Sequence, residues 1–386
     1  MDARLSKPLP ISIGVSRATS PSASAEEFYR SCHRPNLDVV LFFCSPQYDL
    51  KALAQELRHR FGSTPLVGCT TAGEITPFGY IDGSITGVGL TKPDFITVSE
   101  LIHDLRHFTI NDGNRLVQSA LNQLDRRVPE RPQGTTFAFL MIDGTSRQEE
   151  RVISAIYGAL GEIPLLGGSA GDDLSFRHTY TFKDGAFYEH SAVLLLVHTR
   201  HPFRLFKTEH FQSVDKKMVV TAADSDRRVV RELNAEPAAD EYARVIGQKR
   251  SDLNPIVFAA HPLIVRVGGE YHVRSIQQAN ADGSLSFFCA IDEGIVLTAA
   301  KSGDIVADLE SFMDEIRHQL GELQVIIGCD CILRRLEIER KQVKGAISKI
   351  LLENKVIGFS TYGEQYNSMH VNQSFTGVAI GYADLQ

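Results

Sequence analysis

Imidazole, guanidinium and phenol groups are concentrated in one short segment, "HPLIVRVGGEYHVRS", which begins at His261. Its alternating apolar side chains predict two strands that meet at a turn around Gly268 and Gly269. A strand pair of this kind brings the polar groups of the segment close together. These groups belong to His261, Arg266, Tyr271, His272 and Arg274.

Such a set of side chains suits a haem. A neutral imidazole can bind the iron, and guanidinium groups can pair with the propionates. The apolar side chains of Ile264, Val265 and Phe287 would face the macrocycle. The ordinary alternative is a polar strand edge, because a chain with 13 histidines places some of them beside arginines without any function. On the residues alone, both interpretations stay open.

Three other histidines compete as metal ligands. His198 and His201 follow the apolar run "AVLLLV", with arginines beside them, which also suits polar residues at the end of a strand. His370 lies in "SMHVNQSF", where Asn372 and Gln373 could hydrogen-bond a ligand. A structural network within a turn explains His370 equally well.

One loop-like motif occurs three times. "PLVGCTTAGEI" at position 65 returns as "PLLGGSAGDDL" at position 164 and as "KVIGFSTYGEQ" at position 355. Each copy has an apolar pair, a glycine, a hydroxyl two positions later and an acid four positions after the hydroxyl. We expect each glycine to form a turn before the next strand and each hydroxyl to bond to backbone. The glycines are Gly68, Gly167 and Gly358, the hydroxyls Thr70, Ser169 and Ser360, and the acids Glu74, Asp173 and Glu364.

The flanks of the motif repeat as well. The apolar runs "LDVVLFFCS", "TTFAFLMID" and "LQVIIGCDC" precede it with helix-like segments between, and "SITGVGL", "SAVLLLV" and "SFTGVAI" follow it. This order predicts an α/β fold of layered sheets with packed helices, built from repeated strand-helix-strand-turn-strand units. A charged, alanine-rich stretch over 224–235 divides the chain into regions 14–230 and 231–386.

The second copy of the motif contains "GGSAG", which fits the G-x-S-x-G pattern of a hydrolase nucleophile at Ser169. The other copies have Thr70 and Ser360 at this position without the flanking glycines. A local turn residue therefore explains Ser169 better than a nucleophile, and a Ser169-dependent hydrolase is the least favoured function. No Gly-Lys-Ser/Thr follows any copy, which argues against a nucleotide-binding P-loop.

Composition excludes several function classes. The 386 residues carry a net charge of -7 with no basic stripe, so nucleic acid is not an expected partner. The longest apolar run, 192–197, is too short to span a bilayer, and we expect a cytoplasmic protein without a membrane partner. The six cysteines form no C-x-x-C pair, which predicts reduced, buried thiols.

Four stretches together carry a family resemblance: "LFFCSPQYDL", "PLVGCTTAGEI", "LLGGSAGDD" and "GFSTYGEQYNSMHVNQSFTGVAIGY". From residue 37 to 382 the chain resembles the FIST sensory proteins, with FIST N and FIST C regions in tandem. The resemblance implies that 14–230 is the FIST N region, with two repeat units, and that 231–386 is the FIST C region. It also implies sensing of a small ligand for a signalling partner, without catalysis by the domains themselves.

The stretch "FAAHPLIVRVGGEYHVRSIQQANADGSLSFFCAIDEGIVL" resembles the NosP subgroup, which comprises haem-binding nitric oxide sensors. This resemblance implies non-covalent haem b, nitric oxide as the sensed ligand and a sensor histidine kinase as partner, in biofilm or cyclic-di-GMP control. His261 is the expected iron ligand, and Arg266, Tyr271 and Arg274 are the expected pocket residues. The rival iron ligands are His272, His198, His201 and His370.

The alternative within the same family is a sensor of a small organic ligand, such as an amino acid. Arg266, Glu74 and Glu364 are available to bind its charged groups. The sequence is compatible with a homo-oligomer.

Overall fold

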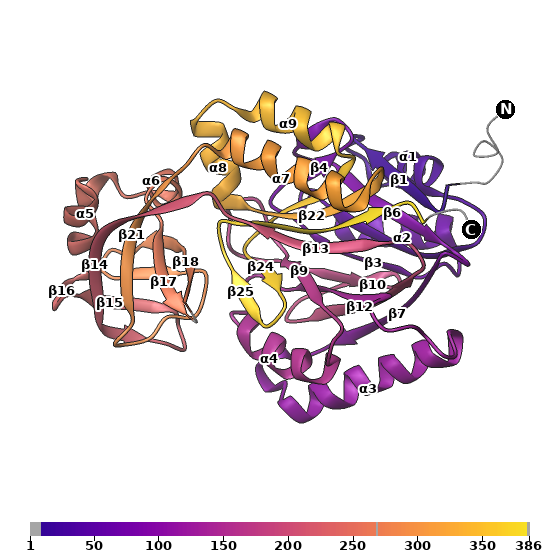
Figure 1. The fold of residues 1–386 in the computed structure, drawn as a ribbon, viewed down its shortest axis with the longest axis horizontal. Helices are drawn as coiled ribbons and strands as arrows, with labels where there is room; N and C mark the ends of the chain where they lie inside the picture. The colour runs from indigo at the N-terminus through magenta and orange to yellow at the C-terminus, as the bar shows by residue number, and fades with distance from the viewer. Residues whose placement is uncertain (1–8, 268, 384–386) are drawn as a thin grey trace.

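The computed structural model describes residues 9–383 apart from residue 268, and only the backbone at 267 and 270. The predicted turn residue Gly268 therefore lies outside the described residues. Figure 1 shows two parts, a large core and a smaller lobe built from one continuous segment of the chain.

The core consists of three units with the same basic element order, to which the third unit adds one helix, α8 (Ile332–Arg340). The first contains β1 (Ile11–Ser16), α1 (Pro21–Cys32), β2 (Leu37–Cys44), α2 (Leu50–Phe61), β3 (Leu66–Thr70), β4 (Glu74–Thr76), β5 (Gly79–Ile81) and β6 (Ile85–Thr91). The second contains β7 (Phe95–Ile102), α3 (Ile110–Arg127), β8 (Thr136–Ile142), α4 (Glu149–Leu160), β9 (Leu165–Ser169), β10 (Thr181–Lys183), β11 (Ala186–Tyr188) and β12 (Ala192–Thr199). The third contains β13 (Phe203–Thr208), α7 (Ile305–Leu320), β22 (Leu323–Cys331), α8 (Ile332–Arg340), α9 (Lys344–Glu353), β23 (Val356–Thr361), β24 (Glu364–Tyr366), β25 (Met369–Val371) and β26 (Phe375–Gly381).

The lobe is inserted into the third unit, between β13 and α7. It contains β14 (Phe211–Asp224), β15 (Val229–Leu233), β16 (Glu236–Pro237), α5 (Ala238–Ile246), α6 (Pro255–Ala260), β17 (Leu263–Val267), β18 (Glu270–Arg274), β19 (Ile276–Ala279), β20 (Leu285–Phe287) and β21 (Val296–Ser302). These strands form a sheet in the order β18-β17-β21-β14-β15-β20-β19, with β16 beside β15. The expected division at 230/231 falls inside β15, which pairs with β14, so the structural lobe spans that division.

The three units are interlocked by their hairpins. Hairpin β10–β11 of the second unit extends the first unit's sheet at β3, and β24–β25 of the third unit extends the second unit's sheet at β9. Hairpin β4–β5 of the first unit closes the ring by pairing with β23 of the third. Each unit thus completes the sheet of another, so no unit has a complete sheet of its own.

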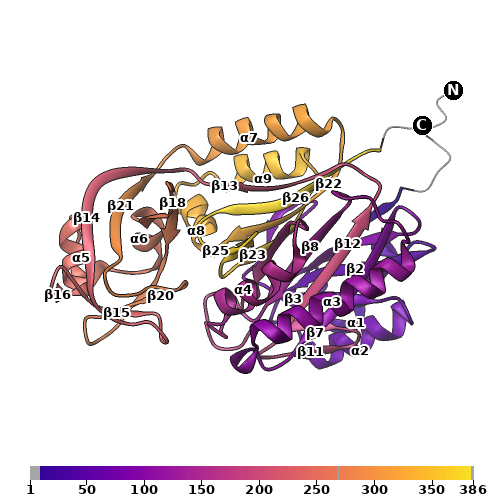
Figure 2. The ribbon, with the colours of Figure 1, turned by 60° about the horizontal axis from the view of Figure 1, so that its bottom comes forward.

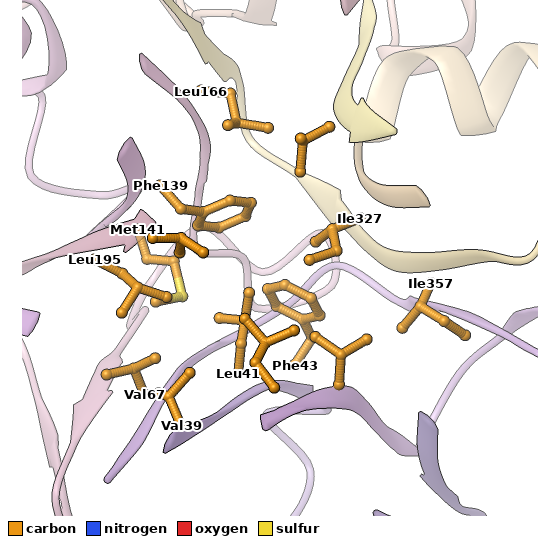
Figure 3. Close-up of a cluster of buried hydrophobic side chains, with 14 of the residues drawn as sticks. Val39, Leu41, Phe43, Val67, Phe139, Met141, Leu166, Leu195, Ile327 and Ile357 are labelled. Carbon is orange, nitrogen blue, oxygen red and sulfur yellow. The ribbon is translucent and has the colours of Figure 1, made fainter. Parts of the chain in front are cut away.

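The hydrophobic centre lies between the inner faces of the three sheets (Figure 3), where side chains such as Phe43, Phe139 and Ile327 meet. Alternate residues of the same strands face outward; in β8, Ala138 and Leu140 pack under α3 and α4. Strands buried on both faces read as continuous apolar runs, which explains the runs in the sequence. The predicted fold of layered sheets with packed helices is confirmed.

The helices begin and end where the sequence supplies caps. The side chain of Asp49 accepts a hydrogen bond from the backbone N–H of Ala52 at 3.0 Å, at the start of α2. Gly62 ends the same helix with φ 59°, a left-handed value that favours glycine. Within the described residues, no helix combines the length and apolar character needed to cross a membrane. All six cysteines are buried free thiols, as predicted.

The prediction for the repeated glycines was wrong. Gly68, Gly167 and Gly358 lie inside β3, β9 and β23 rather than in turns. A side chain at any of them would collide with a backbone carbonyl of the neighbouring parallel strand. Glycine is required here because two strand backbones approach closely, not because the chain turns.

The prediction for the hydroxyls holds at one position of three. Thr70 accepts a backbone hydrogen bond from the N–H of Tyr180 at 3.0 Å. The Ser169 hydroxyl instead accepts from the Gln365 side-chain amide at 3.0 Å. The Ser360 hydroxyl has no hydrogen-bond partner in the part of the chain that the structure describes.

Candidate ligand-binding site

The hairpin β17–β18 carries the residues predicted to bind haem. Its register places Arg266 opposite Tyr271, and Leu263 opposite Arg274. Opposite residues share a face and successive pairs alternate between faces, so Arg266 and Tyr271 lie on the other face from Arg274 and His272. The Arg266 guanidinium lies 6.0 Å from the centre of the Tyr271 ring, and both side chains are exposed.

The expected iron ligand, His261, is half-buried at the end of α6 rather than on β17. Its carbonyl accepts a hydrogen bond from the Tyr242 hydroxyl at 2.7 Å, and burial lowers the pKa of its imidazole. Because Arg266 and Arg274 lie on opposite faces of the hairpin, they cannot both form ion pairs with the propionates of a haem that lies on one face. The four predicted residues therefore do not fit a single haem site.

His198, near the end of β12, and His201, just after it, have structural partners. His198 Nδ1 lies 3.1 Å from the Thr135 hydroxyl. His201 Nδ1 accepts the backbone N–H of Ala383 at 3.0 Å, and its ring stacks on Phe95. These contacts agree with the interpretation of both as polar residues at a strand end.

His370 belongs to a buried polar cluster on hairpin β24–β25. We define the seam cluster as Ser169, Gln365, His370 and Asn372, of which His370 is 5% exposed and the others fully buried. Gln365 lies opposite His370 in the hairpin, and its side-chain nitrogen donates to Ser169 and lies 3.5 Å from His370 Nδ1. Four polar atoms of this cluster have no hydrogen-bond partner among residues 9–267 and 269–383: Gln365 Oε1, His370 Nε2, Asn372 Oδ1 and Asn372 Nδ2.

Two of these unpaired atoms, His370 Nε2 and Asn372 Nδ2, lie beside Gly363. A Cβ atom at that residue would be 2.6 Å from His370 Nε2 and 2.7 Å from Asn372 Nδ2. An unpaired buried polar group costs about 1–3 kcal/mol. Native proteins keep few such groups without a water, ion or ligand to satisfy them. The concentration of four on one hairpin marks the seam cluster as the candidate site.

The seam cluster adjoins the contact between core and lobe, and Figures 1 and 2 both place β25 on the side of the core that faces the lobe. The side chain of Gln373, next to Asn372, bonds to the Ser275 hydroxyl at 3.2 Å and the Ala259 carbonyl at 2.9 Å. Ser275 and Ala259 both belong to the lobe. The candidate site is therefore one residue away from a direct core-to-lobe connection.

Charged side chains surround His370. Arg228 of the lobe pairs with Glu149 at 2.7 Å and with Glu150, both at the start of α4. Burial is the main cause that lowers the pKa of His370; Glu149 and Glu150 act against it, whereas Arg228 and Arg274 add to it. The imidazole is consequently neutral at neutral pH.

Arg274 is a further charged residue near His370. Its Nε is buried and has no hydrogen-bond partner in the described part of the chain, and it lies close enough to influence His370. Of the predicted pocket residues, Arg274 alone joins the electrostatic surroundings of His370.

The acids of the repeat have structural partners. Glu74 accepts the Ser84 hydroxyl at 2.6 Å, and Glu364 accepts that of Ser374 at 2.7 Å. Burial raises the pKa of Glu74 to about 7 and that of Glu364 to about 8. Both lie inside the core while Arg266 is exposed on the lobe, so the structure does not unite them in one site for an organic ligand.

Ser169 does not have the geometry of a hydrolase nucleophile. It ends strand β9, is fully buried, and its hydroxyl accepts from the amide of Gln365 rather than facing a base. Across the described ranges, no group of three or more His, Cys, Asp or Glu side chains is placed to hold a metal ion. The site is suited to binding by hydrogen bonds.

Sequence reasoning identified His370 and Asn372 but not their surroundings. Gln365 and Ser169 meet because a hairpin of the third unit pairs with a strand of the second, and no local pattern reveals this exchange. Glu149 and Arg228 also come from distant segments. The run of polar residues after His370 was the available signal.

The protein is a ring of three interlocked α/β units with an inserted lobe, and it has a buried polar cluster next to that lobe. The FIST N domain matches residues 38–236 and the FIST C domain matches residues 238–367. The chain belongs to the FIST family, whose domains are sensor domains of signal transduction.

Two further similarities are more distant. The chain is 23% identical over 391 residues to the uncharacterized protein MJ1623 of Methanocaldococcus jannaschii, covering 92% of this chain and 75% of that protein. The crystal structure of a cyanuric acid hydrolase from A. caulinodans superimposes with a TM-score of 0.28 and 7% identity, over 50% of this chain and 72% of that chain. Neither relationship identifies a ligand.

Proposed function

We propose that this protein senses a small ligand at the seam cluster and passes the signal to a protein partner without catalysing a reaction itself. The observation that carries the proposal is the group of four unpaired, buried polar atoms next to the lobe. Membership of the FIST family supports a role in signal transduction.

The contacts of β25 suggest how binding would be transmitted. A ligand that bonds Asn372 acts directly beside Gln373, whose side chain holds Ser275 and Ala259 of the lobe. A ligand shifts an equilibrium only if it binds two conformations with different affinity. In this proposal, movement of the lobe against the core supplies the two conformations, because the cluster is buried next to the lobe and the Arg228–Glu149 ion pair joins the two parts.

Haem with nitric oxide is the second candidate, and one observation favours it. His370 is a buried, neutral imidazole with an unpaired Nε2, which is the state that an iron ligand requires. Here His370 would take the place expected for His261, and Arg274 would pair with a propionate. When bound, the haem would supply an iron atom that binds nitric oxide. The partner in this case is a cytoplasmic sensor histidine kinase of biofilm or cyclic-di-GMP control.

Two measurements test the proposal. The unfolding midpoint is followed by circular dichroism with and without the small-molecule fraction of a cell extract, and separately with haemin. A sensor is expected to gain stability from one of these additions, because a ligand that binds only the folded state stabilises it. No shift with either addition contradicts the sensor function.

The haem candidate has a separate test with a matched pair of variants. Absorption spectra of haemin-treated protein are compared for His370→Ala and His261→Ala. Loss of the Soret band in His370→Ala alone supports haem at the seam cluster. Loss in His261→Ala alone returns the ligand to the β17–β18 hairpin, and no band in unmutated protein removes the haem candidate.

A further inference from the structure

We propose that the ligand of the seam cluster is a small planar molecule with a hydrogen-bond donor and an acceptor side by side on one ring edge, as in nucleobases and other cyclic amides. This inference rests on the sensor function proposed above and names the chemical class of the ligand.

The side chain of Asn372 carries the argument. It is fully buried, and both its Oδ1 and its Nδ2 have no hydrogen-bond partner in the described residues. A side-chain amide with both atoms free presents an acceptor and a donor in one plane. Its complement is an adjacent donor and acceptor, which is how asparagine pairs in a bidentate way with adenine. Because both atoms are unpaired, the amide offers an adjacent donor and acceptor in either orientation.

The neighbouring atoms extend the same recognition surface. Gln365 Oε1 is a second unpaired acceptor; its side-chain nitrogen faces the Ser169 hydroxyl at 3.0 Å and the Gly363 carbonyl, which can only accept, at 3.4 Å. His370 Nε2 is a third free position, beside Asn372 Nδ2 at Gly363. A ring with several polar edge atoms matches such a set better than a ligand with a single polar group does.

The charge balance of the seam favours an uncharged ligand. Arg228 is already paired with Glu149 and Glu150, and it also donates to the carbonyl of Phe288. Glu150 is further occupied by the backbone N–H of Ala290 at 2.7 Å. With Arg274, whose charge also reaches His370, the two glutamates and the two arginines carry no net charge, which favours an uncharged ligand over a strongly charged one.

Aromatic rings belong to the same seam. Phe288 of the lobe packs on Phe176 at 5.6 Å and on Tyr362 at 6.0 Å between ring centres, and Tyr362 directly precedes Gly363. Movement of the lobe would separate Phe288 from the two core rings. Planar rings stack favourably on exposed aromatic faces, so an opened seam would offer a surface for a planar ligand.

The experiment uses the full-length protein with adenine and uracil as probes. Each is compared with an analogue of similar shape whose N–H donors are all blocked, namely adenine methylated at N9 and twice on its exocyclic amine, and uracil methylated on both ring nitrogens. Binding is measured by calorimetry and by the shift of the unfolding midpoint. At least one unmodified base is expected to bind at least about tenfold more tightly than its methylated analogue.

Variants locate the site. Asn372→Leu is expected to weaken binding of that base by about tenfold to a hundredfold, whereas Arg266→Met, on the exposed face of the lobe hairpin, leaves it unchanged. Circular dichroism of each variant checks folding, and Asn372→Asp provides a second variant of nearly the same shape in which a charged carboxylate oxygen replaces the amide donor.

Each other outcome overturns the inference. Equal binding of a base and its methylated analogue, or unchanged binding in folded Asn372→Leu, means that the Asn372 edge does not recognise the ligand. Binding of haemin but of neither base means that the ligand class is wrong while the sensor function stands. If neither the bases, haemin nor the cell-extract fraction binds, the sensor function fails as well.

Discussion

Replacing Asn372 with leucine is expected to stabilise the ligand-free protein. Leucine is close to asparagine in shape, and Asn372 buries two polar atoms without a partner in the described residues. Each unpaired buried group costs about 1–3 kcal/mol, and its replacement by an apolar group of similar shape removes that cost. We therefore expect the free energy of unfolding to rise by about 1–3 kcal/mol, an unusual result for a polar-to-apolar change at a functional site.

The matched control is Asn354→Leu. Asn354 is also buried, but its Oδ1 accepts from Arg317 at 2.7 Å and its Nδ2 donates to the Ile350 carbonyl at 2.8 Å. The same substitution there breaks two hydrogen bonds and leaves their partners unsatisfied. It is expected to lower the free energy of unfolding by about 1–3 kcal/mol.

Urea unfolding followed by circular dichroism measures both variants, because the chain contains no tryptophan for a fluorescence assay. Opposite signs for the two leucine variants support the account. If Asn372→Leu is destabilised as much as Asn354→Leu, ordered water or a rearranged side chain already satisfies Asn372. That result would refute the proposal that a ligand satisfies the unpaired atoms of Asn372.

Three further predictions concern the scaffold. Gly358→Ala is expected to prevent soluble folding, because its Cβ would collide with the backbone of the adjacent strand. Gly158→Ala, with open space around it in a helix, is expected to raise the free energy of unfolding by about 0.5–1 kcal/mol. Soluble yield and urea midpoints measure both effects. Burial raises the pKa of Glu364 to about 8, so the folded state favours the protonated carboxyl group. The free energy of unfolding of the wild-type protein, measured by urea titration, is therefore expected to fall between about pH 4.5 and 8 more steeply than that of Glu364→Gln. Glu337→Gln weakens the contact of α8 with His210 at 2.9 Å, next to a strand that leads into the lobe. Trypsin is therefore expected to cleave between core and lobe faster in this variant than in the exposed control Glu353→Gln. Equal cleavage rates would contradict this prediction.

The repeat unit was visible in the sequence because each copy must build the same strand, helix and strand. Apolar runs around Phe43, Phe139 and Ile327 marked the strands that form the shared centre. The glycines were misjudged because a tight turn and a close approach of two strands both require the absence of a side chain. Sequence alone does not distinguish these two reasons at Gly167.

The candidate site was only partly predictable. His370 and Asn372 were identified in "SMHVNQSF" as side chains that could contact a ligand, but their environment depends on which sheet the hairpin β24–β25 joins. The lobe hairpin looked more promising because Arg266 and Arg274 are near each other in sequence. Strand alternation then separates them to opposite faces.

Native mass spectrometry of wild-type protein and Asn372→Leu, purified side by side from the same cells, tests the central claim most directly. The account predicts a small molecule of one defined mass on the wild-type protein that is absent from folded Asn372→Leu. The same bound mass on both proteins would place the ligand away from Asn372. Absence of any bound molecule from the wild-type protein, together with no stabilisation by added extract, would contradict a ligand site between core and lobe.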